Sequence, residues 1–437
     1  MSEQNSGSHK LPEDITVTVV GLGQIGLPLA VLAALQNYKV CGIDIDTNRL
    51  EKIRILDELA IEGPVSLFLQ EEQVIANLQL NTAITKSTAY FVICVPTFLD
   101  DQGNAVVEVV EKAAQAIVPF LTKEATVIIE STMPVGASRK IAKFLEKESG
   151  LHLEKDLFVA YSPERILPGQ AFKELVFNDR VIGGFGDKGI SKALNFYQGI
   201  IKGKILTTSP ETAELVKIAE NSHRLVQIAF ANQMAEVARS VGVDPFSLIK
   251  LANHHPRVNI LNPGIGVGGD CVPVHPLFLK SHDNSLPSLI KEAININSQQ
   301  EDMVVQEVLS SVQRFKKLHK KSKPKVLLLG LTYKPNVADI RNAPAIRIAK
   351  RLAQEEGLQL KVYDPMLDSN QIKKIGFVHL EALSDYKTMD LVVFLVAHAK
   401  FNQIRELNDL PEGSLVDPIG FMRACETLPP MREATTD

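Results

Sequence analysis

Short apolar runs alternate with segments of helical periodicity through the first half of the chain. The run ITVTVV (15–20) enters a glycine-rich turn and an apolar helix, and a second strand, YKVCGIDID (38–46), follows. Further buried strands are predicted at 89–97, 125–136 and 157–169, and helices at 107–120 and 137–149. Strands that alternate with helices are typical of a doubly wound parallel sheet, so this region predicts an α/β domain.

A long helix is predicted over residues 209–242, with Ser209 as its N-cap and Pro210 as its first helical residue. Its many apolar residues indicate burial on more than one face. Lys217, Asn221 and Arg224 lie at i, i+4 and i+7, on one face of this helix, and an Asn inside a helix lowers helix propensity. The sequence therefore marks this stripe as a candidate functional face, with an ordinary solvated stripe as the alternative.

The second half of the chain stays mainly helical over residues 243–310 and then returns to an α/β pattern. The basic stretch RFKKLHKKSKPK (314–325) is predicted to be a solvated linker. Strands are predicted within 325–336, 358–365, 389–398 and 413–418. The expected fold is α/β, with two doubly wound Rossmann-like domains joined by a long central helix and a helical region. The predicted domains span residues 12–208, 209–313 and 322–437.

Composition narrows the class of protein. A chain of 437 residues suits two or three domains, and a net charge of −4 gives no general attraction to nucleic acid or anionic membranes. No run approaches the ~18 apolar residues of a membrane span, and residues 1–13 lack the apolar core of a secretory signal. The four cysteines are widely separated and show no metal-binding spacing. We therefore expect a cytoplasmic protein without a metal site.

The first glycine-rich turn contains GxGxxG, formed by Gly21, Gly23 and Gly26. In this motif the three glycines allow a tight turn, close backbone approach to a pyrophosphate, and packing of helix against strand. Asp44 ends the next strand, about 20 residues on, where a carboxylate binds the ribose 2′-hydroxyl. The order of strand, turn, helix, strand and acid predicts a dinucleotide site that prefers NAD to NADP.

Polar residues follow three predicted strands of the first domain. They are the pairs Pro96-Thr97, Ser131-Thr132 and Glu164-Arg165. Because ligands bind beyond the carboxyl ends of strands in such sheets, we expect the three pairs to line one crevice. The alternative is ordinary turn chemistry, since Pro, Ser and Thr are common in loops.

One cysteine stands in an unusual setting. The stretch GIGVGGDCVPVHP (264–276) places Cys271 after a run of glycines and before two prolines. A nucleophilic cysteine needs an accessible thiolate in an electropositive site, and glycines permit close approach of such a loop. The alternative is a small buried apolar residue beside a turn.

Several of these stretches together resemble the UDP-glucose/UDP-N-acetylhexosamine 6-dehydrogenase family. In family order they are GLGQIGLPLA, VICVPT, ESTMPVG, SPERILPG, ELVKIAENSHR, GVGGDC, GLTYKPNVADIRNAP and VYDP. Residues 162–184 and 252–271 are most similar to the branch that acts on UDP-N-acetylmannosamine. The branch that acts on UDP-N-acetylglucosamine is the close alternative.

The resemblance implies a chemistry. The family oxidises the C6 alcohol of the sugar to a carboxylate with two NAD⁺. Cys271 matches the nucleophile, which captures the intermediate aldehyde as a thiohemiacetal before a thioester forms. Lys217 and Asn221 match residues that stabilise the thiolate and the oxyanion, and Glu164 and Thr132 match positions that handle the hydrolytic water.

The resemblance also implies binding residues. Nucleotide-sugar positions are matched by Glu164, Arg165, Lys217, Arg257, Gly268 and Lys334. Cofactor positions are matched by Gly21, Gly23, Gly26, Asp44, Arg49, Pro96, Thr97, Thr132 and Arg341. No metal is implied, and the spacing of His254, His255 and His275 fits no metal signature.

One position departs from the family. Four residues after Cys271 the family usually has Asp, and this chain has His275. Histidine can serve as a base near neutral pH, so we expect His275 to be catalytic. The alternatives are a packing role for His275, or a catalytically impaired protein that binds nucleotide-sugars.

The resemblance also implies an oligomeric state and a biological role. In the family the central helical region forms a dimer, and an arginine matched by Arg257 crosses the interface. We therefore expect a homodimer or larger homo-oligomer that acts on a UDP-sugar, without nucleic-acid or membrane partners. The expected role is surface polysaccharide biosynthesis.

Overall fold

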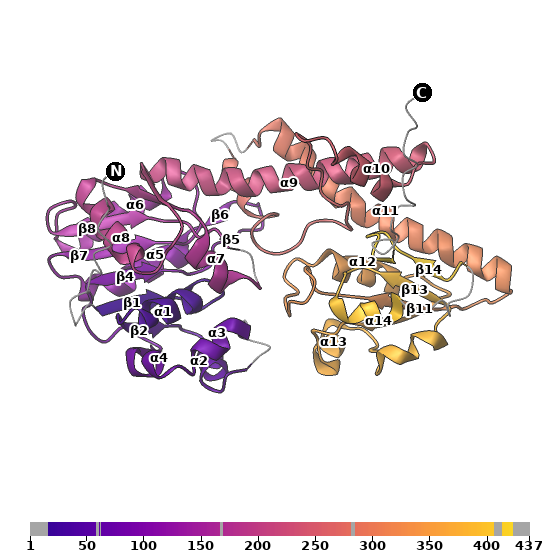
Figure 1. The fold of residues 1–437 in the computed structure, drawn as a ribbon, viewed down its shortest axis with the longest axis horizontal. Helices are drawn as coiled ribbons and strands as arrows, with labels where there is room; N and C mark the ends of the chain where they lie inside the picture. Colours follow the sequence, from indigo (N-terminus) through magenta and orange to yellow (C-terminus); the bar gives the residue numbers. More distant parts are fainter. Residues whose placement is uncertain are drawn as a thin grey trace, which may run out of the picture. The chain divides into compact units, whose positions relative to one another are not determined.

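The computed structural model describes residues 16–57, 61, 63–166, 169–280, 285–405 and 413–422 (Figure 1). The chain divides into two compact units. The first unit is Met1–Asn221 with Val274–Ser285, and the second is Ser222–Pro273 with Leu286–Asp437. The division into three sequence-continuous domains stays a prediction. Cys425 lies outside the described residues.

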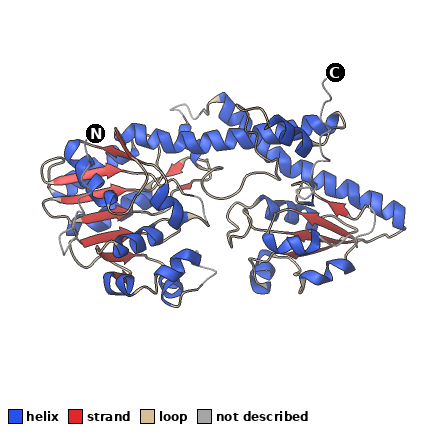
Figure 2. Cartoon of the chain, viewed as in Figure 1, coloured by secondary structure: helices blue, strands red, loops and turns tan. Residues whose placement is uncertain are grey.

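The first unit is built on an eight-stranded sheet in the order β10-β9-β8-β7-β4-β1-β2-β3 (Figure 2). Its strands are β1 (Thr16–Val20), β2 (Lys39–Ile43), β3 (Leu78–Asn81), β4 (Tyr90–Ile93), β7 (Ala125–Ile129), β8 (Leu157–Tyr161), β9 (Arg180–Gly184) and β10 (Ile205–Thr208). The chain starts near the centre and runs outward to each side in turn, which confirms the doubly wound fold. The expectation of a parallel sheet fails at one pair, because β9 is antiparallel to β8.

Helices cover the two faces of this sheet. They are α1 (Gly26–Leu35), α2 (Thr47–Arg54), α3 (Gly63–Phe68), α4 (Glu72–Asn77), α5 (Glu108–Ile117), η1 (Val118–Phe120), α6 (Ala137–Ser149), α7 (Ala171–Phe177) and α8 (Asp187–Gln198). A short hairpin of β5 (Phe98–Leu99) and β6 (Ala105–Val106) and the 3-10 helix η2 (His275–Leu279) complete the unit. Residues 26–34 of α1 are all buried, so this helix lies inside the core rather than on it.

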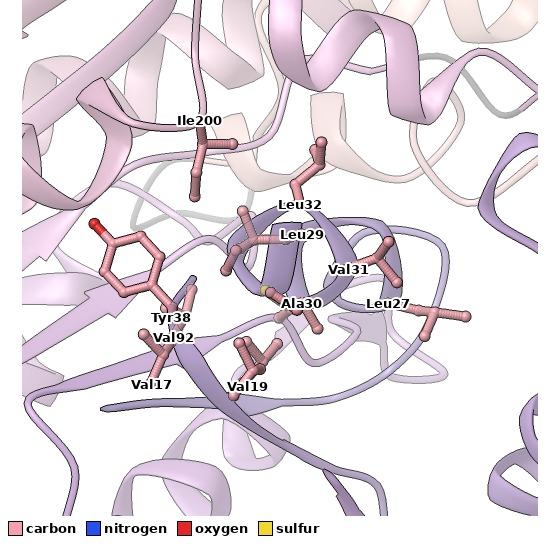
Figure 3. Close-up of a cluster of buried hydrophobic side chains, with 14 of the residues drawn as sticks. Val17, Val19, Leu27, Leu29, Ala30, Val31, Leu32, Tyr38, Val92 and Ile200 are labelled. Carbon is pink, nitrogen blue, oxygen red and sulfur yellow. The ribbon is translucent and has the colours of Figure 1, made fainter. Parts of the chain in front are cut away.

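Figure 3 shows how α1 packs on the central strands. Leu29 and Ala30 of α1 lie over Val17 and Val19 of β1, and all four side chains are fully buried. A helix that is apolar on every side requires such a position, because no face of it suits water. This packing places the N-terminus of α1 directly after the glycine-rich turn at the carboxyl end of β1.

The helix α9 (Pro210–Ser240) begins in the first unit and continues in the second. Ser209 caps it as predicted, because the Thr212 N–H donates to Ser209 Oγ at 3.2 Å.

The second unit contains a four-stranded parallel sheet in the order β12-β11-β13-β14. Its strands are β11 (Lys325–Leu329), β12 (Gln359–Tyr363), β13 (Leu391–Phe394) and β14 (Leu415–Val416). Its other helices are α10 (Pro245–Ala252), α11 (Ser288–His319), α12 (Pro344–Ala353), α13 (Ser369–Ile375), η3 (Leu383–Thr388), η4 (Ala399–Phe401) and α14 (Asn402–Arg405). This sheet confirms the second Rossmann-like element.

The prediction of a solvated linker at 314–325 is wrong. The first half of this stretch is the last part of α11, which ends at His319, and the second half leads into β11. Val312 and Phe315 are buried in the core of the second unit, while the basic residues between and after them face outward or lie partly exposed. Val312 and Phe315 lie three positions apart on one face of the helix, and the basic residues around them make this apolar face difficult to recognise in the sequence. In the described part of the chain, none of the helices has the length and apolar character of a membrane span.

Candidate active site

The glycine-rich turn after β1 has the geometry that its sequence predicts. Gly21 has φ of +92°, a conformation that side chains disfavour. A Cβ at Gly26 would overlap the carbonyl oxygen of Gly21, so this glycine lets α1 start against the turn. At Gly23, by contrast, no described atom lies within 4 Å of the position that a Cβ would take. The backbone at Gly23 is therefore open to a ligand.

Asp44 reaches this turn from the end of β2. Its Oδ2 accepts the Leu22 N–H at 2.9 Å, and its Oδ1 accepts the Asp46 N–H at 2.9 Å. Arg49 of α2 donates from Nε to the Leu22 carbonyl at 3.0 Å. Both side chains thus hold the middle of the turn. An open backbone at a helix N-terminus beside a carboxylate fits a dinucleotide, whose pyrophosphate the helix N-terminus attracts.

The loops after β4 and β7 are joined by hydrogen bonds. Thr97 Oγ1 donates to the Thr132 carbonyl at 2.8 Å, and Ser131 Oγ donates to the Val95 carbonyl at 2.7 Å. Thr97, Ser131 and Thr132 are buried, whereas Pro96 is exposed. The structure therefore brings two of the three predicted strand-end pairs together at one edge of the sheet.

The third pair, Glu164-Arg165, follows β8. Lys217 of α9 forms an ion pair with Glu164, with 2.9 Å between Nζ and Oε1, and both side chains are nearly inaccessible to solvent. Glu164 Oε2 accepts the Ile166 N–H at 2.8 Å. Burial raises the pKa of Glu164, but Lys217 and this N–H outweigh burial and lower the pKa below its ordinary value. Arg165 pairs with Glu220, with 2.6 Å between Nη2 and Oε1.

His275 lies near the ion pair of Glu164 and Lys217. Its Nδ1 is 2.6 Å from Asn221 Nδ2, and only 5% of the residue is exposed. Burial and, to a smaller extent, the positive charge of Lys217 lower the pKa of His275, and Glu164 opposes both, so that the pKa falls to about 3. The imidazole is therefore neutral, with Nδ1 as the acceptor of the amide hydrogen. Glu164, Lys217, Asn221 and His275 are called the Glu164 cluster below. They come from the segment after β8, from α9 and from the start of η2.

The second unit holds Cys271, a half-buried thiol at the end of the glycine loop. A Cβ at Gly268 would lie 2.7 Å from Tyr333 Cβ and 2.9 Å from the Asn342 carbonyl. Gly269 has φ of +80°, and a Cβ there would lie 3.0 Å from the Tyr333 ring. Both glycines are thus required because the loop packs directly on Tyr333.

Hydrogen bonds with other residues after β11 also hold this loop. The Gly269 N–H donates to the Arg341 carbonyl at 2.9 Å, and Asn342 Nδ2 donates to the Gly269 carbonyl at 3.2 Å. The Arg341 guanidinium is paired with Asp270 and Asp339. In this structure Arg341 therefore stabilises the backbone next to Cys271, and its role towards the cofactor stays a prediction.

A buried Asp–His pair supports the segment that contains Lys334. Asp364 Oδ2 accepts the Leu331 and Thr332 N–H groups at 2.6 and 3.0 Å, and His398 Nε2 lies 3.2 Å from it. His398 Nδ1 accepts the Asn336 N–H at 3.0 Å, which leaves its proton on Nε2, facing the carboxylate. Lys334 itself is half-buried, and Arg257 is exposed.

Models of three domains match most of the chain. They are described as the NAD binding domain, central domain and UDP binding domain of the UDP-glucose/GDP-mannose dehydrogenase family, and they match residues 15–201, 211–299 and 327–420. The chain belongs to this family. It is an enzyme, an NAD-dependent UDP-sugar dehydrogenase, and the glycine turn and Asp44 lie in its NAD binding domain.

Comparison with individual proteins supports the same family. The chain is similar to a UDP-N-acetyl-D-mannosamine dehydrogenase of Methanocaldococcus jannaschii, with 39% identity over 80% of this chain and 78% of that protein. It is also similar to an NDP-N-acetyl-D-galactosaminuronic acid dehydrogenase of Ralstonia solanacearum, with 34% identity over 94% and 96%. The solved UDP-D-ManNAc dehydrogenase of Pyrococcus horikoshii superposes with a TM-score of 0.83 and 32% identity, over 93% of this chain and 100% of that one.

Some contacts in this dehydrogenase were not predicted from sequence. Tyr333, Asp270 and Asn342 shape the Cys271 loop, and Asp364 with His398 shapes the segment around Lys334. The paired glycines 268 and 269 signalled that something approaches the loop closely, but no local pattern names the partner.

Proposed function

We propose that this dehydrogenase oxidises the C6 alcohol of UDP-N-acetyl-D-mannosamine to the carboxylate of UDP-N-acetyl-D-mannosaminuronate. The observation that supports this substrate is the 39% identity to a protein named for it, together with the solved structure of the same name. UDP-N-acetyl-D-glucosamine is the alternative substrate. The Ralstonia relative, named for a galactosaminuronic acid, makes the sugar the first point to test.

We propose Cys271 as the nucleophile. When bound, NAD⁺ would accept one hydride in each of two oxidations. After the first, the Cys271 thiolate adds to the aldehyde carbon and forms a C–S bond, which gives a thiohemiacetal. After the second, the carbon is a thioester, and water cleaves the C–S bond to release the acid and the thiol. The glycine loop that presents the half-buried thiol supports this assignment.

The Glu164 cluster supplies the remaining groups of the proposal. Lys217 would stabilise the thiolate and the oxyanion, and Asn221 would donate a hydrogen bond one turn later. Glu164, held as a carboxylate, would act with Thr132 on the hydrolytic water. The observation in support is that Glu164, Lys217 and His275 are buried together and that Asn221 contacts His275.

Binding roles follow the same reasoning. Gly21, Gly23, Gly26 and Asp44 would hold NAD, and Arg257, Gly268 and Lys334 would hold the UDP-sugar. We also propose a homodimer or larger oligomer, since Phe230 and Val237 of α9 are 48% and 49% exposed. We also propose that the enzyme acts in the cytoplasm, in the biosynthesis of a surface polysaccharide.

The test is a panel of UDP-sugars with the wild type and Cys271→Ser. We expect two NADH per UDP-N-acetyl-D-mannosamine from the wild type. The Ser variant should lose net uronate formation and still bind NAD⁺ and UDP-sugar. A preference for UDP-N-acetyl-D-glucosamine would show that this sugar is the substrate instead. Full turnover by the Ser variant would contradict covalent catalysis by Cys271. Binding without turnover by the wild type would indicate a catalytically impaired enzyme.

A further inference from the structure

The start of α9 presents a stripe of three polar side chains to the first unit. Glu214, Lys217 and Asn221 lie at i, i+3 and i+7, which is one face of a helix. Each contacts a different segment: Lys217 pairs with Glu164, Asn221 contacts His275, and Glu214 reaches the N-terminus of α6. Only the last of these contacts lies outside the Glu164 cluster.

The Glu214 contact is buried and uses both carboxylate oxygens. Oε2 accepts the Gly136 N–H at 2.6 Å, and Oε1 accepts the Ser138 N–H at 2.7 Å. These N–H groups belong to the first turn of α6, which has no side-chain cap of its own at Gly136. The partial positive charge of that helix end strengthens both hydrogen bonds. Glu214 is fully inaccessible to solvent, so water offers no substitute for it.

This contact joins two segments that the oxidation needs. Gly136 ends the loop that begins with Ser131 and Thr132 after β7, and Glu214 lies less than one helical turn before Lys217. A buried ion pair is sensitive to geometry, and the 2.9 Å contact of Lys217 with Glu164 depends on how α9 is rotated about its axis.

We propose that Glu214 is a positioning residue for the oxidation: its two hydrogen bonds to α6 fix the rotation of α9 that brings Lys217 to Glu164. This inference rests on the proposed function, because only there does Lys217 take part in chemistry. The competing explanation is that Glu214 merely caps α6 and stabilises the fold.

The test is Glu214→Gln in the full-length enzyme. The amide nitrogen cannot accept a hydrogen bond, so one N–H of α6 loses its partner and faces another donor. We expect kcat to fall by about 10- to 100-fold, since small displacements of a catalytic group cost rates of that order. The KM for UDP-sugar and the Kd for NAD⁺ should stay close to those of the wild type. The acid limb of kcat should also move to higher pH, because Lys217 holds the pKa of Glu164 down.

Glu211→Gln is the matched control. Glu211 also joins α9 to α6, through an ion pair with Arg139, but both side chains are substantially exposed. The control should leave kcat and its pH profile unchanged. If Glu214→Gln does not fold, Glu214→Asp replaces it, because that variant keeps the charge and is one methylene too short to hold both N–H groups.

The outcomes separate the inference from the proposed function. An unchanged kcat and acid limb in the folded Glu214 variant would overturn the inference. So would a loss of thermal stability with no change in the acid limb, which indicates a structural cap. Lys217→Met tests the proposed function: if that variant keeps full activity, the catalytic role of Lys217 fails and the inference fails with it. If Lys217→Met is inactive and Glu214→Gln is fully active, the inference about Glu214 is wrong and the proposed role of Lys217 stands.

Discussion

Replacing His275 by glutamine should change how the stability of the enzyme depends on pH. His275 is nearly inaccessible to solvent, and burial and the adjacent Lys217 together lower its pKa to about 3. In the unfolded chain the imidazole has an ordinary pKa near 6.5. The unfolded state therefore binds a proton on this residue at a pH where the folded state does not.

The sign and the size follow from this difference. A lowered pKa in the folded state gives stability that is complete above about pH 6.5 and is lost as the pH falls towards about 3. Between pH 7 and pH 5, protonation of the unfolded chain at His275 should lower the free energy of unfolding by about 2 kcal/mol. A glutamine at this position cannot take up the proton, so the variant should lack this part of the pH dependence.

Urea unfolding at pH 7, 6 and 5 measures the effect. The wild type should lose about 2 kcal/mol more than His275→Gln over this range. His152→Gln is the control, because His152 is exposed and should leave the wild-type dependence intact. Parallel curves for the wild type and His275→Gln would show that the imidazole is not held neutral. A pH–rate profile of His275→Gln and His275→Asp then tests catalysis: an acid limb and rate unchanged in the Gln variant would exclude His275 as the base.

Three further predictions concern binding and assembly. Asp44 should make kcat/KM much higher with NAD⁺ than with NADP⁺, since its carboxylate repels a 2′-phosphate; equal values in steady-state kinetics would contradict this. Mixing inactive Cys271→Ser and Arg257→Ala chains should restore some activity if the site is shared in a dimer, and an active monomer by sedimentation would refute that. His398→Ala should lower the free energy of unfolding by about 1–3 kcal/mol, because Asp364 and the Asn336 N–H lose a buried partner; unfolding in urea measures it.

Local sequence order predicted the parts of the site that depend on strand ends and helix faces. The turn at Gly21, Gly23 and Gly26 follows from strand–turn–helix order, and Lys217 and Asn221 share a face because of helical periodicity. The joining of Thr97 and Thr132 follows because carboxyl ends of parallel strands meet at one edge of a sheet. These features rely on rules that need no knowledge of distant contacts.

Features that depend on distant contacts were missed or wrong. The antiparallel strand β9, RVIGG, has two glycines and gives a weak strand signal, so its direction was not foreseen. Glu214 and His398 look like ordinary polar residues in sequence. Only their hydrogen bonds to backbone N–H groups 76 and 62 residues away reveal a role. The prediction of a linker at the basic end of α11 was wrong because core packing, not local charge, decides whether a helix continues.

The contrast between Gly23 and Gly26 gives a last prediction, in which two identical substitutions should fail for different reasons. At Gly23 an added methyl group meets no described atom, so Gly23→Ala should fold with nearly wild-type stability. At Gly26 the same group overlaps the Gly21 carbonyl oxygen, and such overpacking costs about 1–3 kcal/mol or more.

Thermal unfolding without ligand and NAD⁺ titration calorimetry together separate the two variants. Gly23→Ala should keep its Tm and lose NAD⁺ affinity, because the methyl group occupies the space where the pyrophosphate approaches the backbone. Gly26→Ala should lose stability before any ligand is added. If Gly23→Ala binds NAD⁺ as tightly as the wild type, the open space at this turn is not where the pyrophosphate lies, and the assignment of the cofactor to the N-terminus of α1 would have to be withdrawn.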